Sequence, residues 1–297
     1  MSTKNYLIVG ATGKQGGAVL DSLLKGPSSS TIHIFALTRN ADSSRAKSLS
    51  AIPQVSVIVG DPAIPEPIFA ATGSSLDGVF CMTVPDGKVS EEDQAKALID
   101  ASIKYRVKHF VFSSADRGGP LSDTNPTTVP NLLSKHNIEE YLKEQAEGRM
   151  TWSILRPSTF MDMLTTDIHG KGFGRLWEGL GSKPLQLVST KDIGHFGAIA
   201  LANPAEYEGK AIGLAGDELT FEEASKIFKK TTGNEMPLAP CIVGKGLKWA
   251  VSDLGPMFKW LETHGFAVDI QSLQKEYPEL QTFQQWLENT SAFRKIK

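Results

Sequence analysis

The chain has 297 residues, of which 40% are hydrophobic and 22% charged, and its formal net charge is -2. This composition is typical of a globular protein and argues against direct binding of nucleic acid, which needs a strongly basic surface. Two cysteines are too few for a disulfide framework, and we find neither a bilayer-spanning apolar run nor a secretion signal. We therefore expect a cytoplasmic protein, with the nucleus as an alternative, that does not contact membranes.

Short runs of β-branched and aromatic residues alternate with helical segments along the first half of the chain. Strands are predicted at residues 6–11, 33–39, 55–61, 78–84, 109–115 and 151–157, and helices at residues 16–25, 43–51, 67–72, 90–105 and 132–146. This alternation indicates right-handed βαβ units. The predicted fold class is α/β, with a Rossmann-type doubly wound parallel sheet.

The alternation weakens after Pro157. We expect further strands at residues 185–190 and 210–216, a helix at residues 193–203, and a mainly helical remainder. The prediction is a first domain formed by residues 1–157 with return segments at about 184–216. Residues 158–183 and 217–297 are predicted to form a smaller, mainly helical domain.

Three glycines lie where the first predicted strand meets the first predicted helix, in the sequence GATGKQG. Gly10 would allow a tight turn, Gly13 would let phosphates approach the backbone, and Gly16 would allow close helix packing. A helix N-terminus also attracts anions. The loop is therefore predicted to bind the pyrophosphate of a dinucleotide, with a tight turn alone as the alternative. It consists of Gly10, Ala11, Thr12, Gly13, Lys14, Gln15 and Gly16.

The end of the second predicted strand decides the choice of cofactor. A carboxylate at this position would hold the ribose hydroxyls of NAD, but the chain has Arg39 there. The planar donors of an arginine match the 2′-phosphate of NADP, so NADP(H) is the predicted cofactor. Lys14 is either a second positive charge near this phosphate or a solvated lysine.

Three more residues lie at the ends of the third and fourth predicted strands, where ligands of parallel sheets bind. Asp61 is predicted near the adenine, although a turn before Pro62 explains it equally well. Thr83 and Val84 are predicted near the ribose of the cofactor.

Several motifs occur in an order that resembles the NmrA-like branch of the atypical short-chain dehydrogenase/reductases, which includes relatives of isoflavone reductases. These are GATGKQG, Arg39, SSA (113–115), Lys135, LRPSTFM (155–161) and TKDIGHFGAIAL (190–201). The resemblance implies an NADP-binding first domain and a substrate-binding second domain. It also implies that Pro157 and Phe160 lie against the nicotinamide and Met161 against the substrate, with a core role as the alternative for Phe160 and Met161.

The catalytic tyrosine of standard short-chain dehydrogenases would stand four residues before Lys135, where this chain has Asn131. An asparagine cannot exchange a proton at neutral pH. Three interpretations remain. Lys135 is the catalytic acid/base, as the resemblance to isoflavone reductases implies; Ser113 or Ser114 holds a substrate carbonyl while water supplies the proton; or Lys135 only holds the ribose and no reaction occurs. On the same helix we expect a solvated Glu139 that pairs with Lys143.

The sequence therefore predicts an oxidoreductase that transfers a hydride from NADPH to a carbonyl, quinone or conjugated double bond of a small aromatic substrate. The alternative is a non-catalytic regulatory protein that senses NADP(H) and binds a partner protein. A homodimer is compatible with either function. We expect no metal site, because the six histidines lie in unrelated sequence contexts.

Overall fold

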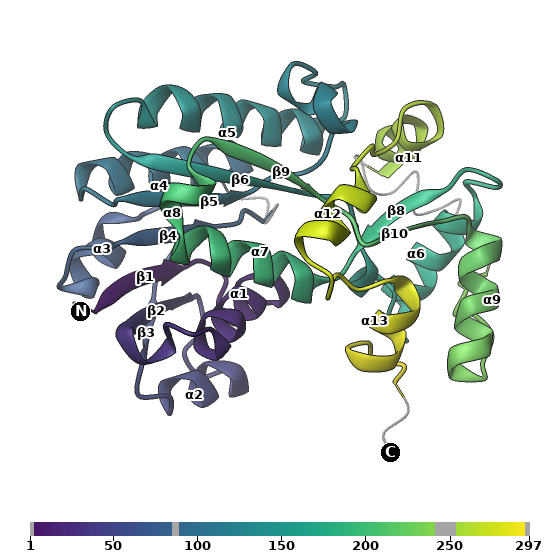
Figure 1. Cartoon of the computed structure of the whole chain (residues 1–297), viewed down its shortest axis with the longest axis horizontal. Coiled ribbons are helices and arrows are strands. Elements are labelled where there is room, and N and C mark those ends of the chain that lie inside the picture. Colours follow the sequence, from purple (N-terminus) through teal and green to yellow (C-terminus); the bar gives the residue numbers. More distant parts are fainter. Residues whose placement is uncertain (1–2, 85–88, 241–253, 295–297) are drawn as a thin grey trace. The chain divides into compact units, whose positions relative to one another are not determined.

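The computed structural model describes residues 3–84, 89–240 and 254–294 (Figure 1). Its contacts divide the chain into two compact units, each made of three segments. Unit 1 comprises Met1–Ser114, Ser134–Arg156 and Ile193–Ile212, and unit 2 comprises Ala115–Leu133, Pro157–Asp192 and Gly213–Lys297.

The main sheet has the strand order β3-β2-β1-β4-β5-β6-β9. Its strands are β1 (Lys4–Ile8), β2 (Ile32–Thr38), β3 (Val55–Val59), β4 (Gly78–Cys81), β5 (His109–Ser113), β6 (Thr151–Pro157) and β9 (Lys210–Leu214). All pairings from β3 through β6 are parallel. The order reverses between β1 and β4, which is the switch point where doubly wound sheets bind their ligands. The predicted Rossmann-type fold class is confirmed.

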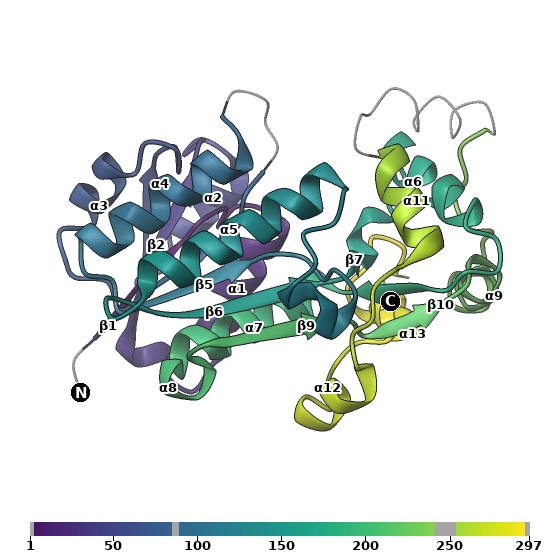
Figure 2. The same cartoon turned by 90° about the horizontal axis from the view of Figure 1, so that it is seen from above.

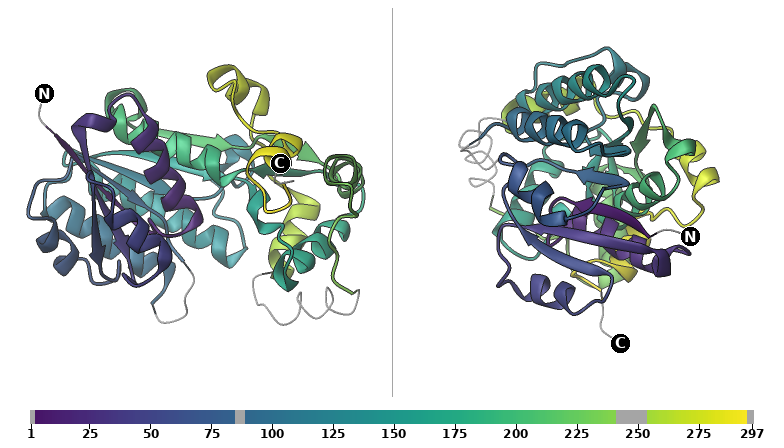
Figure 3. Two further views of the ribbon diagram at one scale, coloured as in Figure 1. Left: turned by 90° about the horizontal axis from the view of Figure 1, so that it is seen from below. Right: turned by 90° about the vertical axis from the view of Figure 1, so that its left-hand side faces the viewer.

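Helices cover both faces of this sheet (Figures 2 and 3). They are α1 (Lys14–Lys25), α2 (Ser44–Ser50), α3 (Glu66–Thr72), α4 (Glu91–Lys104), α5 (Pro130–Ala146), α7 (Thr190–Ala202) and α8 (Pro204–Tyr207). Apolar residues of α3, α4 and α5 form one core with alternate residues of β1, β2, β4 and β5. On the other face α1 and α7 are in close contact, since a Cβ on Gly194 would lie 2.5 Å from Ala18.

Unit 2 is mainly helical, but it also contains a small sheet that the sequence analysis missed. Its strands are β7 (Thr159–Phe160), β8 (Leu185–Val188) and β10 (Asp217–Leu219), in the order β10-β8-β7. Its helices are α6 (Ile168–Glu178), α9 (Phe221–Thr232), α11 (Leu254–Thr263), α12 (Ile270–Glu276) and α13 (Phe283–Asn289). Trp177 and Trp286 are buried in the core that these elements share.

The structure groups two segments differently from the predicted domains. Residues 115–133 lie in unit 2, because Val129 and Leu132 pack against Trp260. Residues 184–192 also lie there, since β8 pairs with β7 and β10 instead of returning to the main sheet.

Residues 3–84, 89–240 and 254–294 contain neither a bilayer-spanning helix nor a cluster of metal-ligating side chains. None of the helices in these ranges is long and apolar enough to span a bilayer. In the same ranges we find no group of three or more His, Cys, Asp or Glu side chains that could hold a metal ion.

A buried carboxylate in unit 2 makes stability depend on pH. Asp192 has no exposed surface and accepts hydrogen bonds from the Ser189 hydroxyl (2.7 Å) and the Gln281 amide (3.1 Å). Its Oδ1 atom has no hydrogen-bond partner among the described residues. Burial raises the pKa of Asp192 to about 6. Because an unfolded aspartate titrates near 3.9, holding this group ionised in the folded chain costs about 3 kcal/mol at neutral pH.

We therefore expect Asp192→Asn to be more stable than the wild type by about 1–2 kcal/mol at pH 8, since the amide keeps an acceptor oxygen but adds an unpaired donor. The advantage should shrink as the pH falls from about 7 to 4, because protonation relieves the cost in the wild type. Urea unfolding at several pH values measures this. Asp217→Asn is the matched control, because Asp217 also accepts a backbone N–H, from Phe283 at 2.9 Å. A pH-independent difference for Asp192→Asn would contradict the expectation.

Candidate functional site

Two positions of the glycine loop, Gly10 and Gly16, cannot accept a residue with a side chain. Gly10 has a φ of 68°, in the left-handed region that side chains disfavour. A Cβ on Gly10 would lie 2.6 Å from the Met82 sulfur, and a Cβ on Gly16 would lie 2.4 Å from the Val9 carbonyl oxygen. Gly10 is required by its left-handed backbone, and Gly16 is required because real Cβ atoms do not approach backbone this closely.

The N-terminus of α1 has no side-chain cap. Gly13 is its N-cap residue, has no side chain to accept a hydrogen bond, and is exposed together with Lys14. No acidic residue lies in the first turn. The neighbouring helices α2 and α4, by contrast, are capped by Ser43 and Ser90. The first N–H groups of a helix have no intrahelical acceptor and carry partial positive charge, so this end fits a phosphate group.

The same loop lies beside the end of β2. The Ala11 amide donates to the Leu37 carbonyl at 3.3 Å, and the Thr12 and Thr38 hydroxyls are 3.3 Å apart. Arg39 follows β2 directly and is exposed. These contacts bring together the two parts of the predicted dinucleotide site, the glycine loop and the arginine that would meet a 2′-phosphate.

Asp61 follows β3 and is exposed, as its predicted place near the adenine requires. Its carboxylate accepts the Ala63 amide at 3.0 Å. This hydrogen bond is the turn geometry that the alternative interpretation described, so the turn accounts for Asp61 without a ligand.

Lys135 lies buried beyond the end of β4, where it contacts Thr83 and a residue that the sequence analysis did not single out. Its ammonium group is 2.7 Å from Glu91 Oε1 and donates to the Thr83 hydroxyl. Thr83 in turn donates to the same Glu91 oxygen at 2.8 Å. The side chains of Lys135 and Glu91 are only 9% and 8% exposed, so this is a buried ion pair.

Cys81, the last residue of β4, lies close to this lysine. Burial raises the pKa of the Cys81 thiol to about 12, although the positive charge of Lys135 acts in the opposite direction. The thiol is therefore protonated at neutral pH. This excludes Cys81 as a nucleophile in the site, because the thiolate is the reactive form.

Two serines lie at the end of β5, Ser113 as its last residue and Ser114 directly after it, and both have their hydroxyl protons engaged within unit 1. Ser113 donates to Gln15 of the glycine loop at 2.7 Å, and Ser114 donates to Glu139. Both serines are buried. Ser113 therefore lies next to the glycine loop, whereas a substrate role for Ser114 would require breaking its bond to Glu139.

The expectation of a solvated Glu139 was wrong. Glu139 is fully buried and forms a two-pronged ion pair with Arg156, whose nitrogen atoms lie 2.6 and 3.2 Å from its two carboxylate oxygens. Lys143 pairs instead with Glu140 at 2.8 Å. The reason is helical geometry, because Glu139 lies one turn after Lys135 on the face of α5 that packs on the sheet.

The motif LRPSTFM supplies three predicted contacts, Pro157 and Phe160 to the nicotinamide and Met161 to the substrate. All three residues belong to unit 2. Pro157 is buried, Phe160 is half-buried, and Met161 is 1% exposed within the apolar core of that unit. Core packing therefore accounts for Met161. The roles of Pro157 and Phe160 stay predictions.

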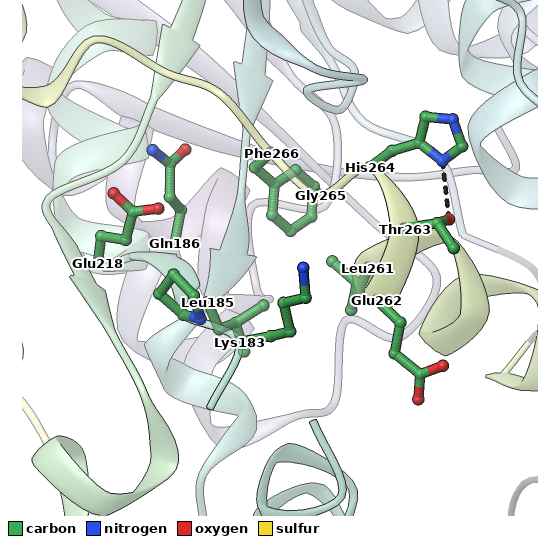
Figure 4. A pocket seen from close by; sticks show the side chains of 11 residues that line it. Lys183, Leu185, Gln186, Glu218, Leu261, Glu262, Thr263, His264, Gly265 and Phe266 are labelled. Carbon is green, nitrogen blue, oxygen red and sulfur yellow. Dashed lines mark hydrogen bonds between the residues drawn. The ribbon is translucent and has the colours of Figure 1, made fainter. Parts of the chain in front are cut away.

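Unit 2 also contains an open pocket of about 180 Å³ that none of the predicted site residues lines. Lys183 points into it, with Phe266 and Leu261 nearby (Figure 4). Gln186 on its wall is bonded to the Val268 backbone at both ends of its amide, at 3.1 and 2.9 Å. The polar groups of this pocket are largely exposed side chains, which gives it no defined ligand chemistry.

Two charged residues near the predicted site were missed, Glu91 and Glu139. In the sequence Glu91 looked like an ordinary acidic residue in a first helical turn, and its partner lies 44 residues away. The burial of Glu139 could have been predicted from its spacing. Residues four apart on a helix share one face, so Glu139 lies on the same face of α5 as Lys135.

Comparison with known proteins places these features in a family. The NmrA-like family pattern matches residues 2–287. The NmrA-like family domain-containing oxidoreductase lnaB of Aspergillus flavus is 25% identical over 287 residues, which span 88% of this chain and 79% of that protein.

Solved structures share the fold at lower identity. Citrobacter sp. triphenylmethane reductase complexed with NADP(H) superposes with a TM-score of 0.74 at 18% identity, covering 97% of this chain and 100% of that one. NADPH-dependent quinone oxidoreductase QOR2 from Escherichia coli gives 0.73 at 19%, covering 96% and 99%. NmrA, a negative transcriptional regulator, gives 0.70 at 16%, covering 97% and 96%. Because the family pattern matches residues 2–287, the chain belongs to the NmrA-like family.

Proposed function

We propose that the chain is an NADPH-dependent oxidoreductase that transfers a hydride to a carbonyl, quinone or conjugated double bond of a small aromatic molecule. The observation that carries this proposal is the uncapped N-terminus of α1, next to glycines that leave no room for a Cβ. Both features fit a bound pyrophosphate. Relatives that are named oxidoreductases, and similar folds solved with NADP(H) or NADPH, support the same function.

Different residues of unit 1 would bind different parts of such a cofactor. The backbone amides that open α1 hold the pyrophosphate, and Lys14 adds positive charge beside them. Arg39 binds the 2′-phosphate, which makes NADPH the preferred form. Val84 and Thr83, after β4, would lie beside the ribose of the bound cofactor.

When bound, the cofactor supplies a hydride, and the protein must supply the matching proton. Lys135 takes this role because Asn131 stands where related dehydrogenases have a tyrosine. Its ammonium group donates one proton to the oxygen of the acceptor as the hydride arrives, and water then reprotonates the amine. One hydride and one proton convert a carbonyl into an alcohol, or a quinone into a hydroquinone after a proton exchange with water.

Turnover is tested by following NADPH oxidation with a panel of quinones, enones and aromatic ketones. We expect Lys135→Met to lower kcat by about tenfold or more while NADPH still binds, because acid catalysis is lost. Lys143→Met is the matched control, since Lys143 lies two turns later on α5 and pairs with Glu140 on the surface. It should leave kcat unchanged. Equal rates for the wild type and Lys135→Met would contradict a role in proton transfer.

Asn131 favours one other function, a non-catalytic NADP(H)-sensing regulatory protein. This alternative predicts that NADPH binds but is not oxidised with any acceptor of the panel. It also predicts that binding of a partner protein differs between the NADP- and NADPH-loaded chain. Failure to bind either dinucleotide would contradict both functions.

A further inference from the structure

The ammonium group of Lys135 is held in a closed ring of three polar groups. Lys135 donates to both Thr83 and Glu91, and Thr83 donates its own proton to the Glu91 oxygen that Lys135 contacts. The three residues come from different elements, α5, the segment after β4 and the first residue of α4. Lys135 thus uses two of its three N–H donors within the ring, and among residues 3–84, 89–240 and 254–294 no further acceptor contacts its ammonium group. The third donor is therefore the one that a bound molecule could meet.

Burying the ion pair of Lys135 and Glu91 costs folding free energy, which suggests that the pair has a role other than stability. Removing a lysine and a glutamate from water carries a large desolvation penalty, which close pairing only partly offsets. The neighbouring Glu92 shows the ordinary case, because it pairs with Lys96 on the surface at 3.2 Å with both side chains about one-third exposed. Two successive glutamates of α4 therefore hold two lysines, one in the interior beside the candidate site and one at the surface.

A second buried ion pair fixes the same helix one turn further along. Glu139 of α5 binds Arg156 of β6 and accepts a hydrogen bond from Ser114 after β5. With Lys135 bound to Glu91, α5 is therefore held at two successive turns against the ends of three neighbouring strands. The backbone of Lys135 therefore has little freedom to shift. The direction of its ammonium group is then set by its contacts with Glu91 and Thr83.

We infer that Glu91 is a positioning residue for Lys135, and that Thr83 completes the arrangement as its hydrogen-bonded bridge. The inference rests on the proposed function, in which Lys135 donates the proton. Glu91 fixes the direction in which the third N–H points and does not itself touch the substrate. Thr83 gives its hydroxyl proton to Glu91, so its side chain can meet a ribose only as an acceptor.

Amine acetylation of the folded, ligand-free chain tests the contact without any turnover. In Glu91→Gln we expect Lys135 to be acetylated about tenfold faster than in the wild type, measured by mass spectrometry against Lys143, because the buried amine loses its charged partner. Glu92→Gln is the matched control. It should accelerate Lys96 and leave Lys135 unchanged. An unchanged Lys135 rate in a folded Glu91→Gln would overturn the inference.

Kinetics with the best acceptor of the panel tests the positioning role. We expect Glu91→Gln to lower kcat about tenfold while KM for NADPH and for the acceptor stays within about twofold, and Glu91→Asp to give an intermediate kcat. Faster acetylation with an unchanged kcat would overturn the inference and leave the proposed function standing. A wild-type chain that oxidises no NADPH would instead overturn the proposed function, and with it the reaction for which Lys135 is positioned.

Discussion

Gly13→Val is expected to weaken the binding of NADPH and of NADH by about 100-fold each, equivalent to roughly 2.7 kcal/mol, without unfolding the chain. Gly13 is exposed, and its φ of -90° and ψ of -175° suit any residue. Among the residues that the structure describes, and apart from its chain neighbours, a Cβ there would meet the Gly10 carbonyl oxygen at 3.2 Å and no other atom within 4 Å. A valine side chain is therefore expected to occupy the space proposed for the pyrophosphate. Because both dinucleotides share that group, the two affinities should fall together.

Gly26→Val is the matched control at the other end of the same helix. Gly26 flanks α1 with a φ of -70° and a ψ of 164°, and a Cβ there would first meet the Leu23 carbonyl oxygen at 3.4 Å. We expect this variant to bind both dinucleotides as the wild type does. Fluorescence titration gives the dissociation constants, and circular dichroism checks the fold. Undiminished binding by Gly13→Val would show that phosphates do not approach the loop.

The glycine loop could be predicted from sequence because its information is local. Gly10, Gly13 and Gly16 follow a buried strand at a fixed spacing, and the turn depends on sterics within seven residues. The alternation of strands and helices predicted the main sheet for a similar reason, since hydrophobic periodicity identifies each element separately.

The charge pairs of the site could not be predicted in the same way. Lys135 was singled out from its sequence motif, whereas Glu91 is its partner only because the parallel order of β4, β5 and β6 brings α4 and α5 together. The surface expectation for Glu139 failed because an (i, i+4) rule describes isolated helices, whereas burial against Arg156 decides the pairing in the folded chain. Tertiary contacts of this kind have no signature within one element.

The small sheet of unit 2 was missed because its strands are too short to show periodicity. β7 has two residues and β10 three, while strand alternation needs at least four to be recognised. β8 alone was predicted, and without partners it was assigned to the main sheet. Residues 184–192 therefore belong to unit 2 and not to the unit that contains the main sheet.

Arg39→Gln is expected to weaken NADPH about 30-fold, roughly 2 kcal/mol, and to change NADH by less than about twofold. The glutamine keeps a hydrogen-bonding side chain but loses the charge and the planar fork that match a 2′-phosphate. NADH carries no such phosphate, so its affinity should be insensitive to this position. The two dissociation constants, measured by titration at low salt, give the ratio directly, because screening at high salt would reduce the difference.

Arg149→Gln controls for the general loss of one positive charge from unit 1. Arg149 is exposed and lies two residues before the first residue of β6, whereas Arg39 directly follows β2, so the two arginines lie at opposite edges of a parallel sheet. This control should leave both affinities unchanged. Equal weakening of NADPH and NADH by Arg39→Gln would assign Arg39 to the part that both dinucleotides share. Lys14, an exposed lysine within the glycine loop, would then be the next residue to test for the preference for NADPH.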